Sequence, residues 1–275
     1  MIALHARRSA ASIAAWREAG AHRPLVVALT GTDLYRDIDS DAAAHRSLDL
    51  ADALIVLNTL GPDRLSAAWR AKAHVVLQSC AARQPLPRPR SFVRALMVGH
   101  LRDEKDPLCF VRAARRLAHR ADLRFDHIGA ALDPALGEAV QRAQAELPHY
   151  RWLGAMPHGQ VRRRIASAHV LVHASRIEGG AHVVIEALRS GTPVVASRID
   201  GNVGLLGTDW PALFEPGDDA GLAALLQRAR DDGDMLAELQ RRADLRVPLF
   251  TPEAEAAALK TMVAALLEPP PGDPR

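Results

Sequence analysis

Two glutamates, Glu178 and Glu186, enclose a Gly-Gly pair in the stretch RIEGGAHVVIEAL. The pair follows an apolar run and opens a helical pattern, so the backbone N–H groups of Gly179 and Gly180 are placed to receive a diphosphate. On the loop, the Glu178 carboxylate can accept hydrogen bonds from sugar hydroxyls. Glu186 lies further into the expected helix and shares a face with His182, which suits a ribose diol. Together these residues favour a nucleotide sugar as the ligand.

A structural interpretation of each glutamate remains open. Glu186 could form a surface pair with Arg189, worth a few tenths of a kcal/mol. Glu178 could be a carboxylate that the dipole of a helix beginning near Ala181 favours. The combined order of a strand, Glu178, Gly-Gly, helix, Glu186 and then a second strand after Gly191-Thr192-Pro193 favours the functional interpretation.

A second candidate segment is VGHLRDEKDP, residues 98–107. It places a glycine at the end of an apolar run, followed by polar residues and a proline that can begin a helix, which is where open α/β sheets bind ligands. Lys105, with Arg102 and His100, could meet an anionic group there. The alternative is a solvated turn with Lys105 as a surface charge.

Short apolar runs alternate with amphipathic segments along most of the chain, which predicts an α/β fold with parallel sheets covered on both faces. The proline-rich segment QPLPRPR, residues 84–90, interrupts the alternation and predicts an extended linker. We therefore expect an N-terminal acceptor-side domain (1–88), a donor domain (91–250) and a C-terminal helix with a frayed tail (251–275). The predicted strands cover residues 2–6, 25–29, 53–57, 74–78, 92–99, 123–129, 150–154, 169–175 and 193–197.

The predicted helices include 9–19, 64–70 and 252–267, with further helices beginning near Pro107, Pro134, His158, Ala181 and Gly217. Only about four strands precede the linker, against about six in a full doubly wound domain. The first domain is therefore expected to be N-terminally incomplete, lacking one or two βα units.

Composition limits the class of protein. Of the 275 residues, 48% are hydrophobic and 24% are charged, as in folded soluble proteins. No apolar run is long enough to span a bilayer and the N-terminus does not resemble a secretory signal, so we expect a cytoplasmic protein without membrane insertion. Cys80 and Cys109 are isolated, which favours free thiols and no metal site. The net charge is only +3 and the arginines are scattered, which argues against nucleic-acid binding.

The two glutamates and the segment after them resemble the donor-site signature of the retaining GT-B glycosyltransferases of family 4. The segment VGHLRDEKDP is similar to that family's Gly-Arg-Leu-x-x-Glu-Lys loop, with His100 in place of the usual arginine. The segments SRIDGNVGLLG (197–207) and LFEPGD (213–218) resemble its next two motifs. The resemblance implies two Rossmann-like domains facing across a cleft, a UDP-sugar donor and no metal or other cofactor.

The same resemblance implies roles for individual residues. Glu178 would contact the donor sugar as a catalytic residue, Glu186 would bind the ribose, and Lys105 would hold the diphosphate. Arg102 or a protonated His100 could replace the missing arginine of the diphosphate clamp. The implied donor-binding set is His100, Arg102, Lys105, Gly179, Gly180, Ala181, His182 and Glu186.

The segments ALHARRSAASI (3–13) and VALTGTDLYRDI (27–38) resemble the selenosugar synthases of selenoneine biosynthesis, a divergent branch of this group. That family is implied to transfer a sugar from UDP-N-acetylglucosamine or UDP-glucose to selenophosphate. The guanidinium groups of Arg7 and Arg8 can each bind a small polyanion through two hydrogen bonds. His5 would be a second catalytic residue beside the donor sugar. The acceptor-binding set is Arg7, Arg8, Thr32 and Asp33.

The sequence leaves three alternatives open, one for the two arginines and two for the function. Arg7 and Arg8 could be an exposed basic step into a helix that Ser9 caps. The chain could be a conventional glycosyltransferase with an alcohol or lipid acceptor. It could also be a non-catalytic nucleotide-sugar-binding protein, since His100 departs from the family pattern. The sequence predicts neither the sugar nor the oligomeric state.

Overall fold

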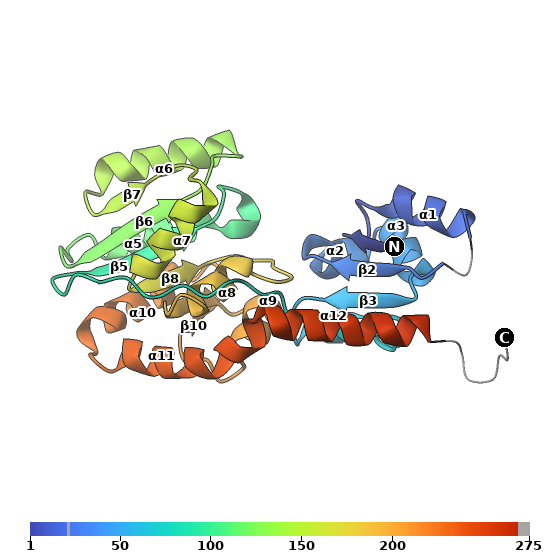
Figure 1. Ribbon diagram of the computed structural model, residues 1–275. Coiled ribbons are helices and arrows are strands. Elements are labelled where there is room, and N and C mark those ends of the chain that lie inside the picture. The colour runs from blue at the N-terminus through green and yellow to red at the C-terminus, as the bar shows by residue number, and fades with distance from the viewer. Residues whose placement is uncertain (21–22, 269–275) are drawn as a thin grey trace.

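The computed structural model describes residues 1–20 and 23–268, which form two α/β units joined by an extended segment and by a long C-terminal helix (Figure 1). The predicted tail at residues 269–275 lies outside the described residues. Both units contain parallel sheets, which confirms the predicted fold class.

The first unit is built on a four-stranded sheet in the order β1-β2-β3-β4. The inner strands β2 and β3 are buried along their whole length, as expected for apolar runs covered on both faces. The strands are β1 (Ile2–Leu4), β2 (Val26–Leu29), β3 (Ala53–Val56) and β4 (Ala73–Val75). The helices are α1 (Ala10–Glu18), α2 (Thr32–Tyr35), η1 (Asp37–Asp39), α3 (Ala42–Leu50), η2 (Gly61–Arg64) and α4 (Ala67–Arg70).

One helix prediction in this unit is wrong. The single helix expected over residues 64–70 is divided between η2 and α4, because Leu65 is extended and Ser66 begins a new helix. The Ser66 hydroxyl accepts a hydrogen bond from the N–H of Trp69, so it caps α4 where the sequence pattern suggested continuity.

The second unit contains a six-stranded parallel sheet in the order β10-β9-β8-β5-β6-β7. Its order reverses at β5 and β8, where a crevice opens at the carboxyl ends of the strands. The strands are β5 (Val93–Val98), β6 (Leu123–Ile128), β7 (Tyr150–Trp152), β8 (Val170–His173), β9 (Val194–Ser197) and β10 (Leu213–Phe214). The helices are η3 (Asp103–Lys105), α5 (Pro107–Arg116), α6 (Pro134–Glu146), α7 (His158–Ser167), α8 (His182–Leu188), α9 (Asp200–Leu206), α10 (Asp219–Asp231), α11 (Met235–Arg246) and η4 (Val247–Phe250).

The chain passes between the units twice. The predicted linker is extended and hydrogen-bonds to the second unit, through the N–H of Leu86 and the carbonyl of Ala166. Helix α12 (Pro252–Leu267) has the predicted bounds and returns to the first unit (Figure 1). There Met262 packs in one buried cluster with Val26 and Ile55. The last helix therefore covers one face of the first sheet. None of the described helices is long and apolar enough to cross a membrane.

Met262 provides a test of this packing. The side chain is 2% exposed, so Met262→Ala is expected to lower the free energy of unfolding by roughly 2–5 kcal/mol, measured by urea denaturation. Leu267→Ala on the same helix is the control, because Leu267 is 64% exposed and its truncation is expected to cost less than about 0.5 kcal/mol. Equal effects of the two substitutions would contradict the packing of α12 on the first sheet.

Candidate active site

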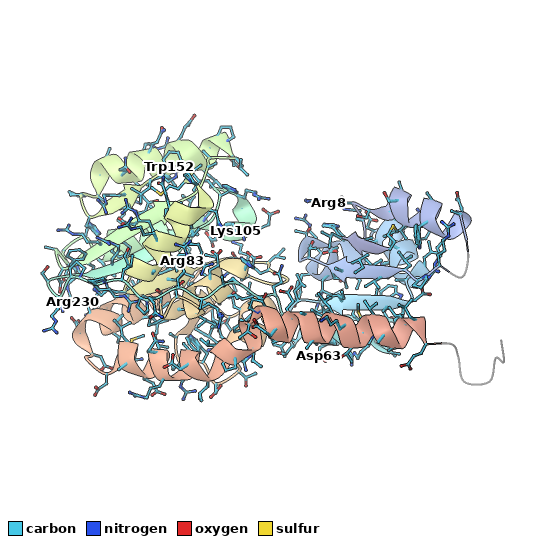
Figure 2. The ribbon with its side chains drawn as sticks, viewed as in Figure 1. Arg8, Asp63, Arg83, Lys105, Trp152 and Arg230 are labelled. Carbon is cyan, nitrogen blue, oxygen red and sulfur yellow. The ribbon has the colours of Figure 1, made fainter. Side chains whose placement is uncertain are left out.

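The candidate site surrounds Glu178, on the loop between β8 and α8. Three hollows border this residue. One, of about 280 Å³, lies between Tyr35 and Arg64 of the first unit and Arg176 and Asp200 of the second. The other two also share Arg102 and Lys105. The larger, of about 500 Å³, is enclosed by the second unit alone. The smaller, of about 200 Å³, lies between the two units, with His5 and Arg8 on one side and Arg102 and Lys105 on the other. Arg8 and Lys105 lie on facing sides of the two units (Figure 2). The carboxyl ends of strands from both sheets thus contribute to one site.

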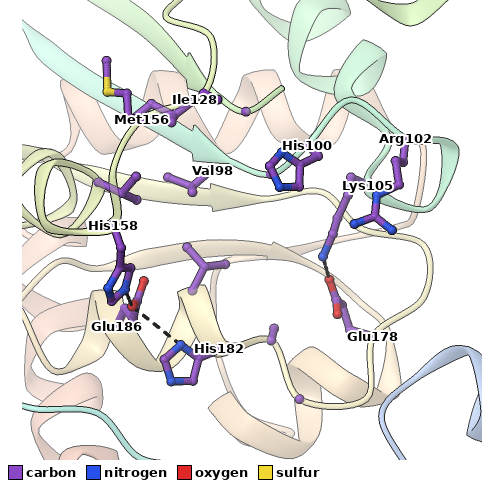
Figure 3. A pocket seen from close by; sticks show the side chains of 17 residues that line it. Val98, His100, Arg102, Lys105, Ile128, Met156, His158, Glu178, His182 and Glu186 are labelled. Carbon is purple, nitrogen blue, oxygen red and sulfur yellow. Dashed lines mark hydrogen bonds and ion pairs between the residues drawn. The ribbon is translucent and has the colours of Figure 1, made fainter. Parts of the chain in front are cut away.

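The Glu178 carboxylate forms one end of the larger hollow (Figure 3). Its Oε1 accepts hydrogen bonds from Lys105 Nζ and from Ser175 Oγ, the latter at 3.2 Å, and lies 3.4 Å from His173 Nε2. Burial raises the pKa of Glu178, but the His173 hydrogen bond and the Lys105 charge outweigh it and lower the pKa to about 2. The carboxylate is therefore ionised throughout the physiological range.

Glu186 forms the opposite end of the same hollow and is 4% exposed (Figure 3). Its Oε1 lies 2.5 Å from His158 Nε2, 3.6 Å from His182 Nδ1 and 3.8 Å from Arg162. The alternative surface pair with Arg189 is wrong, because Arg189 donates to the carbonyl of Cys80 instead. His158 and Arg162 on α7 contact Glu186 only through tertiary packing, so no local spacing in the sequence indicated them.

An apolar wall joins the two ends of the larger hollow. Val98 and Ile128 come from the ends of β5 and β6, and Met156 lies on the loop before α7 (Figure 3). A wall of this kind between charged ends suits an elongated ligand that carries one flat or apolar portion.

The Gly-Gly pair divides its contacts between the hollow and the first unit. Helix α8 begins at His182, with Ala181 at the N-cap position, and Gly180, Ala181 and His182 line the hollow. Gly179 instead packs against Thr30, where a Cβ would lie 2.6 Å from the carbonyl group. Only glycine allows this approach of the two backbones.

Asn58 fixes the same loop from the first unit. Its side chain is fully buried and donates to the carbonyl of Gly179 at 2.7 Å and to Tyr35 Oη at 3.0 Å. The loop between β8 and α8 is therefore fixed by a residue of the first unit, a contact that no local pattern in the sequence indicates.

His100 and Arg102 line the larger hollow beside Lys105. His100 Nδ1 accepts a hydrogen bond from the N–H of Ala130 at 3.0 Å, so in the neutral ring the proton lies on Nε2. Within the described chain, Arg102 makes no ion pair, and it also lines the smaller hollow. A free guanidinium thus lies where the two hollows meet.

His5 lies in the smaller hollow in a left-handed backbone conformation, with φ of 70°. Its Nδ1 accepts from the N–H of Arg8 and its Nε2 lies 3.0 Å from Thr32 Oγ1, so the neutral ring donates to that hydroxyl. Non-glycine residues rarely adopt this backbone geometry outside sites that impose it. His5 is 5% exposed and is thereby held within the lining of the hollow.

Two of the predicted acceptor residues occupy other places. Asp33 is buried and accepts from the N–H groups of Ala6, Thr30 and Gly31, so it fixes the loop instead of facing the cleft. The Arg7 guanidinium is held by Asp37 at 2.8 Å and does not line the hollow.

Arg8 and Thr32 do line the smaller hollow. Arg36, which no sequence pattern indicated, also lines this hollow and pairs with Glu104 of the second unit at 3.4 Å. Ser9 stands at the N-cap of α1, but its hydroxyl donates to the carbonyl of Leu4 and does not cap the helix. Arg7 and Arg8 are both exposed, so the alternative of an exposed basic step into α1 stays open, and only its capping by the Ser9 hydroxyl is wrong.

The site carries positive charge on its side chains. Among the described residues, no group of three or more His, Cys, Asp or Glu side chains is arranged to hold a metal ion. The positive charge that faces the hollows comes from Lys105 and from arginines.

Two facing α/β units with parallel sheets, and a site at the strand ends between them, define the GT-B class of glycosyltransferase fold. Residues 81–246, more than half of the chain, match the family described as glycosyl transferases group 1. The chain belongs to this family.

Solved structures share the fold at low sequence identity. Anabaena HepE, solved with UDP and glucose, gives a TM-score of 0.78 at 16% identity, over 96% of this chain and 77% of that one. Sucrose-phosphate synthase from Thermosynechococcus elongatus gives 0.77 at 19%, over 96% and 73%. S. aureus TarM gives 0.68 at 14%, over 89% and 50%. A comparison with proteins of curated function finds no match.

Proposed function

We propose that this chain is a selenosugar synthase, which transfers a sugar from a UDP-sugar to selenophosphate and forms a carbon–selenium bond. Family membership supports the glycosyl transfer. The observation that carries the acceptor assignment is the small hollow between the units, of about 200 Å³. Its lining has four cationic side chains, Arg8, Arg36, Arg102 and Lys105, against two carboxylates, Glu104 and Glu178. A hollow of this size and charge suits a compact polyanion better than a glycan or a lipid.

The larger hollow is assigned to the UDP-sugar. Lys105 and Arg102 meet the diphosphate, with His100 Nε2–H and the backbone around Gly180 as further donors. Glu178 accepts from the sugar hydroxyls. Glu186 accepts from the ribose diol through Oε2, which makes no hydrogen bond within the described residues, whereas Oε1 is hydrogen-bonded to His158. HepE, a structural neighbour of this chain, has been solved with UDP-glucose.

In the proposed reaction the bond between the anomeric carbon and the UDP oxygen breaks, and the electron pair leaves with UDP. A selenium lone pair of selenophosphate forms the new bond to the anomeric carbon. Water then cleaves the P–Se bond, which releases phosphate and leaves a 1-selenosugar. Because this selenium is already anionic, the acceptor needs no general base. Stabilisation of the departing diphosphate by Lys105 and Arg102 then supplies most of the rate enhancement, and His5 and Thr32 border the path of the acceptor.

The location assigned with this function is the cytoplasm. Cys80 and Cys109 are both buried free thiols, which suits a reducing compartment. No nucleic acid, membrane or metal takes part in the proposed reaction.

Mass spectrometry tests the function. The protein is incubated with UDP-N-acetylglucosamine or UDP-glucose and with selenophosphate, thiophosphate or phosphate. A selenium-containing sugar that forms only with selenophosphate is the expected result. A sugar transferred to an alcohol acceptor, with none transferred to selenophosphate, would contradict the acceptor. UDP binding by calorimetry without turnover of either UDP-sugar would indicate a binding protein instead.

Arg8 and Arg7 form a matched pair for testing the acceptor hollow. Arg8→Ala removes a guanidinium that lines it and is expected to raise the KM for selenophosphate by about 10- to 100-fold, as for a lost charged hydrogen bond. Arg7→Ala is expected to raise it less than about threefold, because Arg7 is held by Asp37 outside the hollow. The measurement is initial rate against selenophosphate concentration. Equal effects of the two substitutions would place the acceptor elsewhere.

A further inference from the structure

His173 is a buried histidine that the assigned roles do not use. It ends β8 and is 2% exposed. Its Nε2 lies 3.2 Å from Ser175 Oγ and 3.4 Å from Glu178 Oε1. It therefore lies directly beneath the carboxylate at which the two hollows meet.

The contacts of the ring determine which nitrogen carries the proton. Nδ1 is enclosed and has no hydrogen-bond partner among the described residues. A buried N–H without an acceptor is costly, and an ionised carboxylate can only accept. The proton of a neutral ring therefore lies on Nε2, where it is donated to Glu178 and Ser175.

Lys105 is the other strong partner of Glu178, but its situation differs. Its side chain is 27% exposed and lines both hollows, so it is free to turn toward a ligand. When Lys105 engages a diphosphate, Glu178 loses that partner. His173 is enclosed by the core of the second unit and cannot turn away.

We propose that His173 is a positioning residue, whose Nε2–H holds the Glu178 carboxylate aimed at the donor sugar while Lys105 holds the diphosphate. The inference rests on the proposed function, because it requires Glu178 to contact the sugar. The low pKa of Glu178, for which the His173 hydrogen bond is the largest favourable cause, is consistent with it.

Two substitutions at this position separate hydrogen bonding from packing. The glutamine amide of His173→Gln reaches about as far as Nε2 and keeps a donor, whereas His173→Leu keeps the volume and removes it. Calorimetry measures the affinity for UDP, which lacks the sugar, and for UDP-N-acetylglucosamine and UDP-glucose. For the UDP-sugar that the wild type binds more tightly, His173→Leu is expected to weaken binding by about 10-fold, with UDP affinity unchanged, and His173→Gln to restore most of the loss.

The outcomes distinguish this inference from the proposed function. If His173→Leu binds the UDP-sugar as the wild type does, or if both variants weaken UDP and UDP-sugar equally, His173 is only a packing residue and the inference is wrong. Glu178→Gln is measured alongside. If Glu178→Gln also leaves UDP-sugar binding and turnover unchanged, Glu178 does not contact the sugar. The assignment of the larger hollow to the UDP-sugar is then wrong, whatever the role of His173.

Discussion

Glu178→Gln is expected to lower kcat by about 100- to 1,000-fold, the range for loss of one preorganised electrostatic group in an active site. The substitution keeps the shape of the side chain but removes the negative charge that Lys105, Ser175 and His173 surround. A neutral amide cannot stabilise the positive charge that develops on the sugar ring as UDP departs. Initial rates of UDP release at saturating UDP-sugar and acceptor provide the measurement.

UDP itself lacks the sugar, so its affinity for Glu178→Gln is expected to stay within about twofold of wild type. Glu215→Gln is the control, because Glu215 forms an exposed pair with Arg198 and lines neither hollow. A variant at Glu178 that retained full turnover would remove this residue from the mechanism. A loss of UDP affinity equal to the loss of turnover would indicate a distorted loop instead.

Glu186→Ala is expected to raise the Kd for UDP by about 30-fold, near the 2 kcal/mol typical of a lost hydrogen bond to a charged group. Glu186 closes the far end of the larger hollow, where the ribose is assigned, and it lies apart from the reacting carbon. Because the ribose is bound equally in the ground and transition states, KM for the UDP-sugar should rise with little change in kcat. Isothermal calorimetry with UDP and initial-rate kinetics measure the two effects.

Arg162 loses a nearby anion in Glu186→Ala, but it keeps its hydrogen bond to the carbonyl of Ala81. Thermal unfolding should accompany the binding measurement, so that a folding defect is recognised. Glu146→Ala is a suitable control in the same unit, because Glu146 is exposed and pairs with Arg115. Unchanged UDP affinity in Glu186→Ala would show that the nucleotide does not occupy this end.

Much of the fold could be predicted because apolar runs such as residues 25–29 and 193–197 are buried on both faces, and such runs are visible without any alignment. The elements that were missed include two regular helices, α3 and α11, as well as pieces with a weak periodic signal. Strand β10 has only two residues, and α9 carries three polar or glycine positions in its first turn. The interruption at Ser66 depends on one hydroxyl that caps a helix, and a periodic pattern cannot anticipate it.

The candidate site was predictable where residues lie at the ends of parallel strands. Lys105 and Glu178 are far apart in sequence, yet they follow neighbouring strands β5 and β8, so the topology brings them together. Their partners His173 and Asn58 could not be predicted, since buried polar contacts depend on tertiary packing. Asp33 was predicted to face the acceptor because it is a polar residue in a strand-end loop. Its side chain points inward instead, where its carboxylate accepts hydrogen bonds from three backbone N–H groups.

Helix α12 also determines the order in which the chain can fold as it is synthesised. One face of the first sheet, with Val26 and Ile55, is covered by Met262 and its helix neighbours. The ribosome synthesises the strands of this sheet early, but α12 emerges only after the entire second unit has been translated. The second unit can therefore fold before α12 covers the first sheet. Until then the first sheet exposes an apolar face to which chaperones can bind.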